Sequence, residues 1–243
     1  MLHEVGGAGQ QRLRAARVLM VGAGGLGASA LLYLAAAGVG TIGIVDDDDV
    51  GLSNLQRQVL FATEDVDRPK VEAAAAALAR LNPHVAVEPH PFRLGPENVD
   101  GLVAGYDLVI DGSDNFPTRY LVNAACVRAA TPLLAAAMTQ WEGQIGLYDP
   151  ARGGPCFACL FPEAPAPGLV PTCAEAGIVG ALPGVMGSML ALEAIKLITG
   201  AGTGLRGALA IYDALNADSR RFATAARAGC AVCGGRGGRP GGT

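Results

Sequence analysis

Short apolar runs alternate with alanine-rich segments in the first half of the chain. Residues 17–21 (RVLMV), 41–45 (TIGIV) and 107–111 (DLVID) have the length and composition of buried strands. The segment between the first two runs, and residues 69–81, are rich in alanine, which favours helix. This alternation predicts an α/β fold, namely a Rossmann-like, mostly parallel sheet with helices on both faces.

The second half extends this pattern and then changes in texture. Further strands are expected at 85–88, 133–137 and 144–148, helices at 118–130 and 185–198, and a last strand at 209–213. Gly, Pro and Cys become frequent after residue 151, and the chain ends in a glycine-rich tail. We therefore expect a nucleotide-binding part over 1–150, a metal- and partner-binding part over 151–233, and a disordered tail over 234–243.

Composition narrows the class of protein. Hydrophobic residues make up 51% and charged residues 16%, with a net charge of -4, so we expect a large core and no nucleic-acid partner. Residues 18–45 carry no charge, but glycines divide them into strand, turn, helix and strand, so we expect no membrane span. The first residues show no secretory signal, which favours the cytoplasm.

A glycine-rich turn links the first strand to its helix. Gly22, Gly24, Gly25 and Gly27 form a Gly-x-Gly-x-x-Gly pattern at a position where a helix N-terminus can bind phosphate. Asp46, at the end of the next strand, is placed to accept hydrogen bonds from ribose hydroxyls. The pattern alone fits NAD, FAD, S-adenosylmethionine or ATP, and a turn without a ligand is the alternative.

Charged residues downstream favour a triphosphate over NAD. Arg57 and Lys70 can reach phosphates beyond the two that a glycine turn holds, although surface cations are often merely solvated. Asp114 follows a buried strand at the edge of the sheet where ligands bind, and its carboxylate can hold Mg²⁺. A helix N-cap formed within Ser113, Asp114 and Asn115 is the alternative.

Four of the six cysteines form two Cys-x-x-Cys pairs, Cys156 with Cys159 and Cys230 with Cys233. Two such turns complete a tetrahedral zinc site with no open coordination position, which indicates a structural role. Two disulfides or a redox pair are the alternatives.

The other two cysteines differ in their settings. Cys126 has apolar neighbours in a predicted helix and is expected in the core. Cys173 lies between a Pro-rich loop and a helix, where it is either a candidate nucleophile or an inert loop thiol.

Together these residues resemble the MoeB/ThiF/HesA adenylyltransferases, bacterial relatives of ubiquitin-activating enzymes, and most closely the molybdopterin-synthase branch. The resemblance extends to Cys233. It rests on the glycine pattern and both cysteine pairs, and on Asp46 and Asp48, Asn54-Leu55-Gln56-Arg57-Gln58, Pro69-Lys70-Val71, Asp114-Asn115-x-x-x-Arg119 and Thr172-Cys173-x-Glu175-Ala176-Gly177.

The resemblance implies an enzyme that adenylylates the C-terminal Gly-Gly carboxylate of a ubiquitin-like sulfur-carrier protein. The products would be an acyl adenylate and pyrophosphate, before a thiocarboxylate forms. It implies ATP, Mg²⁺ and structural Zn²⁺, and a homodimer. It assigns the ribose to Asp46, the phosphates to Asn54, Arg57 and Lys70, Mg²⁺ to Asp114, and further nucleotide contacts to Asp48 and Asn115. Cys173 matches a cysteine that some relatives use in a covalent step.

The N-terminus departs from the family pattern. Relatives carry an arm with an Arg-Tyr-x-Arg-like segment whose arginine reaches the active site of the other subunit. This chain begins past that position, and Arg12 and Arg14 lie at a different offset, so either the start is truncated or that arginine is lost. A non-catalytic member that binds ATP and a partner is therefore one alternative. An NAD-dependent oxidoreductase is another, but it leaves Arg57, Lys70 and the cysteine pairs without a joint purpose.

Overall fold

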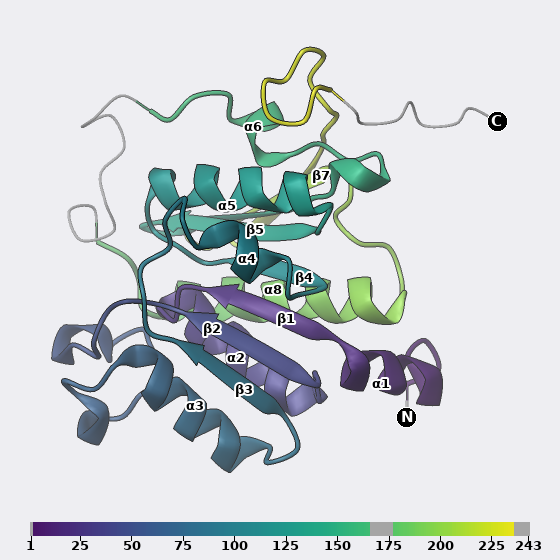
Figure 1. The fold of residues 1–243 in the computed structure, drawn as a ribbon. Coiled ribbons are helices and arrows are strands. Elements are labelled where there is room, and N and C mark those ends of the chain that lie inside the picture. The colour runs from purple at the N-terminus through teal and green to yellow at the C-terminus, as the bar shows by residue number, and fades with distance from the viewer. Residues whose placement is uncertain (1, 166–176, 236–243) are drawn as a thin grey trace.

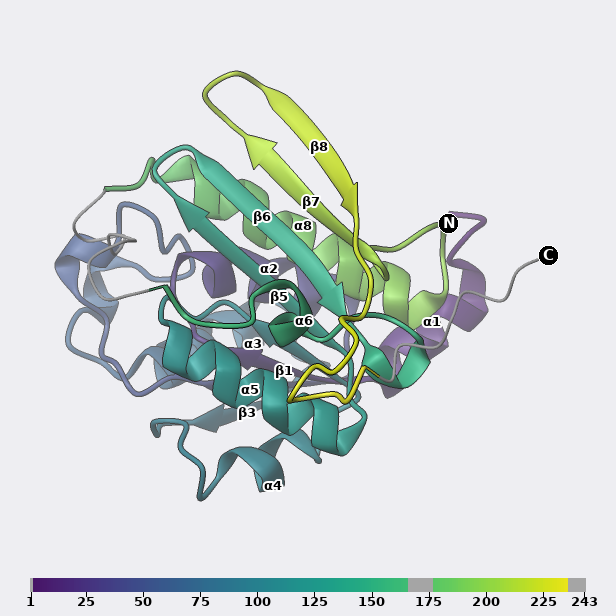
Figure 2. The ribbon, with the colours of Figure 1, turned by 90° about the horizontal axis from the view of Figure 1, so that it is seen from above.

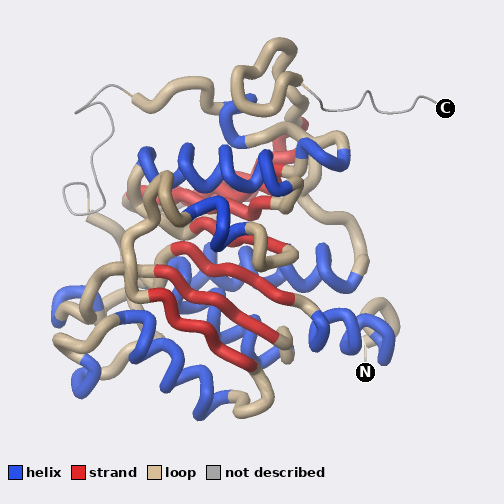
Figure 3. The backbone as a smooth tube through the Cα atoms, viewed as in Figure 1, coloured by secondary structure: helices blue, strands red, loops and turns tan. Residues whose placement is uncertain are grey.

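Eight strands form one mixed sheet in the order β3-β2-β1-β4-β5-β6-β7-β8 in the computed structural model, which describes residues 2–165 and 177–235 (Figure 1). β1 to β5 run parallel, whereas β6, β7 and β8 are antiparallel to their neighbours. Helices lie on both sides of the sheet (Figure 3). The strands are β1 (Arg17–Val21), β2 (Thr41–Val45), β3 (Ala86–His90), β4 (Leu108–Asp111), β5 (Leu133–Thr139), β6 (Glu142–Tyr148), β7 (Ala208–Asp213) and β8 (Asp218–Ala223).

The central strands are apolar because both faces of the sheet are covered. Along β1, Val18 and Met20 belong to one hydrophobic cluster, and Leu19 and Val21 belong to another on the opposite face. The first cluster lies against α1 (Gly6–Ala15), α2 (Gly25–Ala37), α3 (Lys70–Leu81) and α8 (Ala181–Thr199), and the second against α4 (Val99–Val103), α5 (Phe116–Ala129) and α6 (Phe157–Leu160) (Figures 1 and 2). The predicted α/β fold is confirmed.

Helix α8 is the one described helix that is long and apolar enough to cross a membrane by length and composition alone. Its residues Leu182, Met186 and Leu190 are buried in the cluster shared with α2. It therefore packs as a core helix of this domain.

Several described elements, among them α1, α4, α6 and β8, were not predicted from the sequence, and one prediction was wrong. β7 is not the last strand, because the chain turns and returns as β8, the edge strand of the sheet (Figure 2). The β8 sequence DSRRFA is mostly exposed and has no apolar face, so pairing with β7 defines it. α1 escaped prediction because three glycines among its ten residues disfavour helix.

The predicted parts divide at residue 150, but the sheet continues past it through β7 and β8. That division stays a prediction. Of the tail predicted to be disordered, Gly234 and Gly235 lie in a turn, and residues 236–243 are outside the described part of the chain.

Candidate active site and metal centre

A cavity of about 500 Å³ opens at the carboxyl ends of β1, β2 and β4. The chain order reverses between β1 and β4, which is where open α/β sheets bind ligands. The volume is that of a small-molecule site. The predicted nucleotide residues that line it are Gly22, Gly24, Gly25, Asp46, Asp48, Asn54, Arg57, Lys70, Asp114 and Asn115.

The glycine turn forms the floor of this cavity. Gly22 has φ +87°, and a Cβ on Gly27 would overlap the Gly22 carbonyl oxygen, so the helix approaches the strand only with glycine at these positions. Gly24 is the N-cap of α2, and no side chain caps the helix. The first N–H groups of α2 are therefore available to an anion.

Backbone N–H groups from two segments of the chain hold the Asp46 carboxylate in place. Its carboxylate accepts hydrogen bonds from Ala23 N at 2.7 Å and from Asp48 N at 2.9 Å. Burial raises the pKa of the Asp46 carboxyl, while the Lys70 ammonium and these N–H donors oppose part of that rise. The arrangement holds an acceptor beside the glycine turn, as ribose binding requires.

Lys70 is a buried cation, only 5% exposed. Its Nζ donates to Asp48 Oδ2 at 2.6 Å and lies 3.9 Å from Asp46 Oδ1. The start of α3 lies at the cavity because backbone hydrogen bonds join the segment before α3 to the segment after β2. One of them runs from Val50 N to Arg68 O. The two aspartates therefore hold the ammonium at the cavity wall.

Arg57 and Asn54 come from a short 3₁₀ turn, η1 (Leu52–Asn54), and the residues after it. Asn54 Oδ1 accepts from Gly51 N at 3.2 Å, and Arg57 Nη1 donates to Ser53 O at 3.3 Å. Gln58, next along the chain, is 3% exposed. No separate role was predicted for Gln58, but its Oε1 has no hydrogen-bond partner within the described residues.

The loop after β4 presents Asp114. Asp111 accepts from Ser113 N at 2.8 Å, and the buried Arg119 donates to Ser113 O, so both backbone groups of Ser113 are held. Asn115 Oδ1 accepts from Thr118 N at 3.0 Å and caps α5. The N-cap considered for this loop is therefore Asn115, and the exposed Asp114 carboxylate is left to face the cavity.

The sequence reasoning missed one wall of the cavity, Phe92, Arg93 and Leu94. These residues follow β3, which ends at His90 and not at residue 88 as expected. Their place after a parallel strand, at the carboxyl edge of the sheet, was the available signal. Arg93 adds a third cation to the cavity.

The cavity fits a magnesium nucleotide by its donor set. Cations at Arg57, Lys70 and Arg93 suit phosphates, and the Asp114 carboxylate suits Mg²⁺. Two buried polar atoms at its wall, Gln58 Oε1 and Ser113 Oγ, have no partner within the described residues, as expected where a polar ligand binds.

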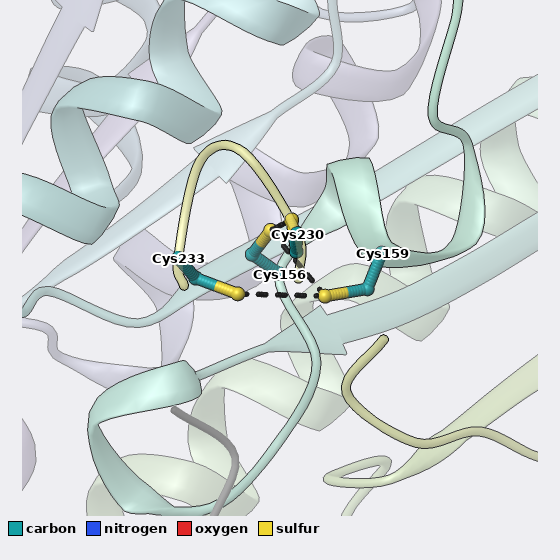
Figure 4. A group of neighbouring side chains, drawn as sticks. All are labelled: Cys156, Cys159, Cys230 and Cys233. Atoms are coloured by element: carbon teal, nitrogen blue, oxygen red, sulfur yellow. Dashed lines mark hydrogen bonds between the residues drawn. The ribbon is translucent and has the colours of Figure 1, made fainter. Parts of the chain in front are cut away.

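The four paired cysteines meet in one buried cluster (Figure 4). Cys156 Sγ lies 3.7 Å from the Sγ atoms of Cys159 and Cys230, and Cys159 Sγ lies 3.5 Å from that of Cys233. A tetrahedron of sulfurs around zinc has edges of about 3.8 Å, whereas a disulfide needs about 2.05 Å. The geometry fits a closed metal site and does not fit two disulfides.

The pKa values of the clustered thiols are shifted by burial and by hydrogen bonds. Burial raises the pKa of Cys156 and of Cys159. Burial also opposes ionisation of Cys230, but N–H groups of Cys233 and Val232 outweigh it and lower the pKa of that thiol to about 6. A thiolate buried among thiols is stabilised by a bound metal ion.

The two remaining cysteines differ in what the structure says of them. Cys126 is 3% exposed in α5, as the sequence predicted, and burial raises its pKa. Cys173 and the motif residues 172–176 lie outside the described part of the chain.

Comparison with known proteins identifies the family. The sequence matches the ThiF family over residues 1–232. The chain belongs to the ThiF family. It is 50% identical over 238 residues to the sulfur carrier protein adenylyltransferase of Thermus thermophilus, covering 96% of this chain and 88% of that protein. It is 50% identical over 234 residues to the SAMP-activating enzyme E1 of Haloferax volcanii, covering 96% and 86%. The predicted family and class of enzyme, an adenylyltransferase, are confirmed.

A solved structure of an Escherichia coli protein has the same fold. The crystal structure of Escherichia coli MccB with ATP matches with a TM-score of 0.80 at 25% identity, covering 93% of this chain and 68% of MccB. ATP use follows from membership of this adenylyltransferase family.

Proposed function

We propose that this ThiF-family chain adenylylates the C-terminal Gly-Gly carboxylate of a ubiquitin-like sulfur-carrier protein. A carboxylate oxygen of the carrier attacks the α-phosphorus of ATP, and the bond between the α-phosphorus and the bridging oxygen of pyrophosphate breaks. The products are an acyl adenylate and pyrophosphate. The carboxylate is already a nucleophile, so the reaction needs aligned reactants and neutralised charge more than a general base.

The proposal gives each described residue a task. The phosphates are held by the first turn of α2 and by Arg57 and Lys70. Asp46 accepts hydrogen bonds from the ribose hydroxyls. Lys70 and Arg57 offset the charge that builds up when two anions approach. Bound Mg²⁺, held by Asp114, would neutralise phosphate oxygens. Asp48 orients the Lys70 ammonium, to which it is hydrogen bonded.

The cysteine cluster takes a structural role in this proposal. Zinc held by Cys156, Cys159, Cys230 and Cys233 would fasten the segment after β8 to α6, since each supplies two of the ligands. Cys173 stays a candidate for a covalent step after adenylate formation. Its position carries no structural support, because it lies outside the described residues.

The assembly and compartment belong to the same proposal. The sulfur carrier is the protein partner, and the enzyme is a cytoplasmic homodimer. On the helix layer of α2 and α8, the large apolar side chains of Tyr33, Val185 and Leu192 are exposed in the single chain, and a second copy would cover them.

One observation carries the proposal. The cavity at the switch point brings together a glycine turn, three cations and the carboxylates of Asp46 and Asp114, in a chain half identical to a sulfur carrier protein adenylyltransferase. A site for NAD would need only two phosphates neutralised.

ATP–pyrophosphate exchange tests the proposal on the full-length protein with Mg²⁺ and candidate carriers ending in Gly-Gly. We expect exchange that depends on one carrier and is lost in Asp114→Ala. Asp100→Ala is the matched control, because Asp100 is an exposed carboxylate on α4 that pairs with Arg128. Carrier-independent exchange, or exchange that survives Asp114→Ala, would contradict the assignment.

A further inference from the structure

His90, the last residue of β3, joins two walls of the nucleotide cavity. Its main-chain oxygen accepts from Phe92 N at 2.9 Å and from Asp46 N at 3.4 Å. Asp46 is the proposed ribose acceptor, and Phe92 begins the wall that the sequence reasoning missed. A displacement of His90 would therefore move both sides of the nucleoside end of the cavity.

The strand that carries His90 has little else to fix it. β3 is an edge strand that pairs only with β2, and none of its residues is buried. Pro89 also removes one backbone donor from it. Val87 is the β3 residue that packs against the core cluster, so the pairing with β2 and polar side-chain contacts set the position of His90.

One such contact anchors the His90 ring. Its Nε2 lies 2.9 Å from the hydroxyl of Tyr106, and that hydroxyl donates to Glu88 Oε2 at 2.7 Å. Arg17 Nη2 donates to both carboxylate oxygens of Glu88, at 2.9 and 3.0 Å, so the ionised Glu88 can only accept. The single hydroxyl hydrogen of Tyr106 is then used, and His90 Nε2 must carry the hydrogen of the His90–Tyr106 bond.

Strand β2 has a gap that admits this tyrosine. A Cβ on Gly43, in the middle of β2, would overlap the Tyr106 hydroxyl and ring. Glycine within a strand weakens it, and here it lets the 7%-exposed Tyr106 side chain lie across β2 to reach β3. The ring also lies under the Arg17 guanidinium, 5.2 Å from its carbon to the ring centroid.

We propose that Tyr106 and His90 are positioning residues for the nucleoside half of ATP. Seated against Gly43, the Tyr106 hydroxyl fixes the His90 ring, and the His90 carbonyl fixes Asp46 and Phe92 relative to each other. The phosphate half of the cavity, built on α2, Arg57 and Lys70, meets this anchor only weakly: Lys70 Nζ lies 3.9 Å from Asp46 Oδ1, and its hydrogen bond goes to Asp48. The inference rests on the proposed function, because it takes ATP as the ligand.

The difference between the two halves provides the test. Calorimetry on the full-length protein with Mg²⁺ should compare AMP, ATP and pyrophosphate. We expect Tyr106→Phe to weaken AMP and ATP about tenfold, the effect of one lost buried hydrogen bond, and to leave pyrophosphate within about twofold. In the exchange assay, the KM for ATP should rise by the same factor at unchanged kcat.

Two further variants separate positioning from general stability. His90→Leu removes the Nε2 donor and should match Tyr106→Phe, whereas His90→Gln restores an amide donor and should recover most of the AMP affinity. Tyr120→Phe is the control, because its hydroxyl donates to Phe161 O at 2.9 Å outside the cavity lining, and it should leave both affinities unchanged. A parallel loss of AMP and pyrophosphate affinity, or no rescue by His90→Gln, would overturn the positioning role.

The outcome also distinguishes this inference from the proposed function. Wild-type protein that binds neither AMP nor ATP would overturn the proposed function, and this inference with it. Wild-type binding that Tyr106→Phe leaves unchanged would overturn the positioning role alone.

Discussion

The nucleotide cavity and the cysteine cluster are both built from segments distant in the sequence, but they solve opposite problems. The cysteine cluster uses four identical ligands, all buried, with sulfurs already at the spacing of a filled site. The cavity is open and mixes carboxylates with cations, and the Lys70 ammonium donates to Asp48. One site brings together four like ligands for a single ion, and the other brings together groups of opposite charge for the separate parts of the proposed nucleotide.

This difference predicts where damage will appear. Changes in the cavity should reduce the reaction more than the stability, because its charged groups other than the buried Lys70 are at least partly exposed. Changes in the cysteine cluster should reduce stability first, because the metal binds a folded site and its binding energy adds to folding. Each prediction below tests one side of that division.

The largest effect is expected at Lys70. Lys70→Met removes the buried cation beside Asp46 and Asp48, leaving the phosphates facing uncompensated carboxylates. We expect ATP–pyrophosphate exchange to fall on the order of a thousandfold, since removing one charge-stabilising group costs about 10²–10³ in kcat. Initial rates at saturating ATP measure this loss.

Arg80→Met is the control for Lys70. Arg80 is an exposed cation in the last turn of the same helix, so its loss should leave exchange within about twofold, as for most surface substitutions. Thermal unfolding should be similar in both variants. Exchange by Lys70→Met at a tenth of the wild-type rate or more would place the charge compensation elsewhere.

The second effect concerns the metal. Cys233→Ser should abolish bound zinc, measured by elemental analysis, and lower the free energy of unfolding by about 3 kcal/mol. The affinity for ATP, measured below the unfolding transition, should change far less. A loss of ATP affinity as large as the loss of stability would show that the two sites are not separate.

Cys126→Ala is the matched control for that experiment. Cys126 is also a buried thiol, but it lies in α5 outside the cluster. Its truncation should cost about 1 kcal/mol of packing and leave the zinc content unchanged.

The same division explains how far sequence reasoning could go. The cysteine cluster was predictable in full, because spacing alone brings two thiolates of each pair together. β1, β2 and α2 were also predictable, since apolar runs and a glycine turn determine them locally. β8 was not, because its sequence has no apolar face and only the β7 partner makes it a strand.

The cavity was predictable only in part, and not as an arrangement. Arg57, Lys70 and three of its carboxylates were named from the motifs, but Arg93 was not, and the pairing of Lys70 with Asp48 depends on tertiary contacts. The wall at Phe92 depends on where β3 ends, and the sequence placed that end two residues too early. The Gly43 gap depends on a tyrosine 63 residues away in the chain, which no local pattern can indicate.

The smallest effect is expected at Asn115, on the boundary between stability and binding. Asn115 lines the cavity, but its Oδ1 already accepts from Thr118 N as the cap of α5. Asn115→Ala should therefore cost about 1 kcal/mol in chemical denaturation, and Asn115→Ser should restore most of it. ATP affinity should stay within about threefold in both variants, because a residue that only caps α5 makes no contact with the ligand. A tenfold loss of ATP affinity in Asn115→Ser, with stability restored, would move Asn115 from the scaffold of the cavity to its binding surface.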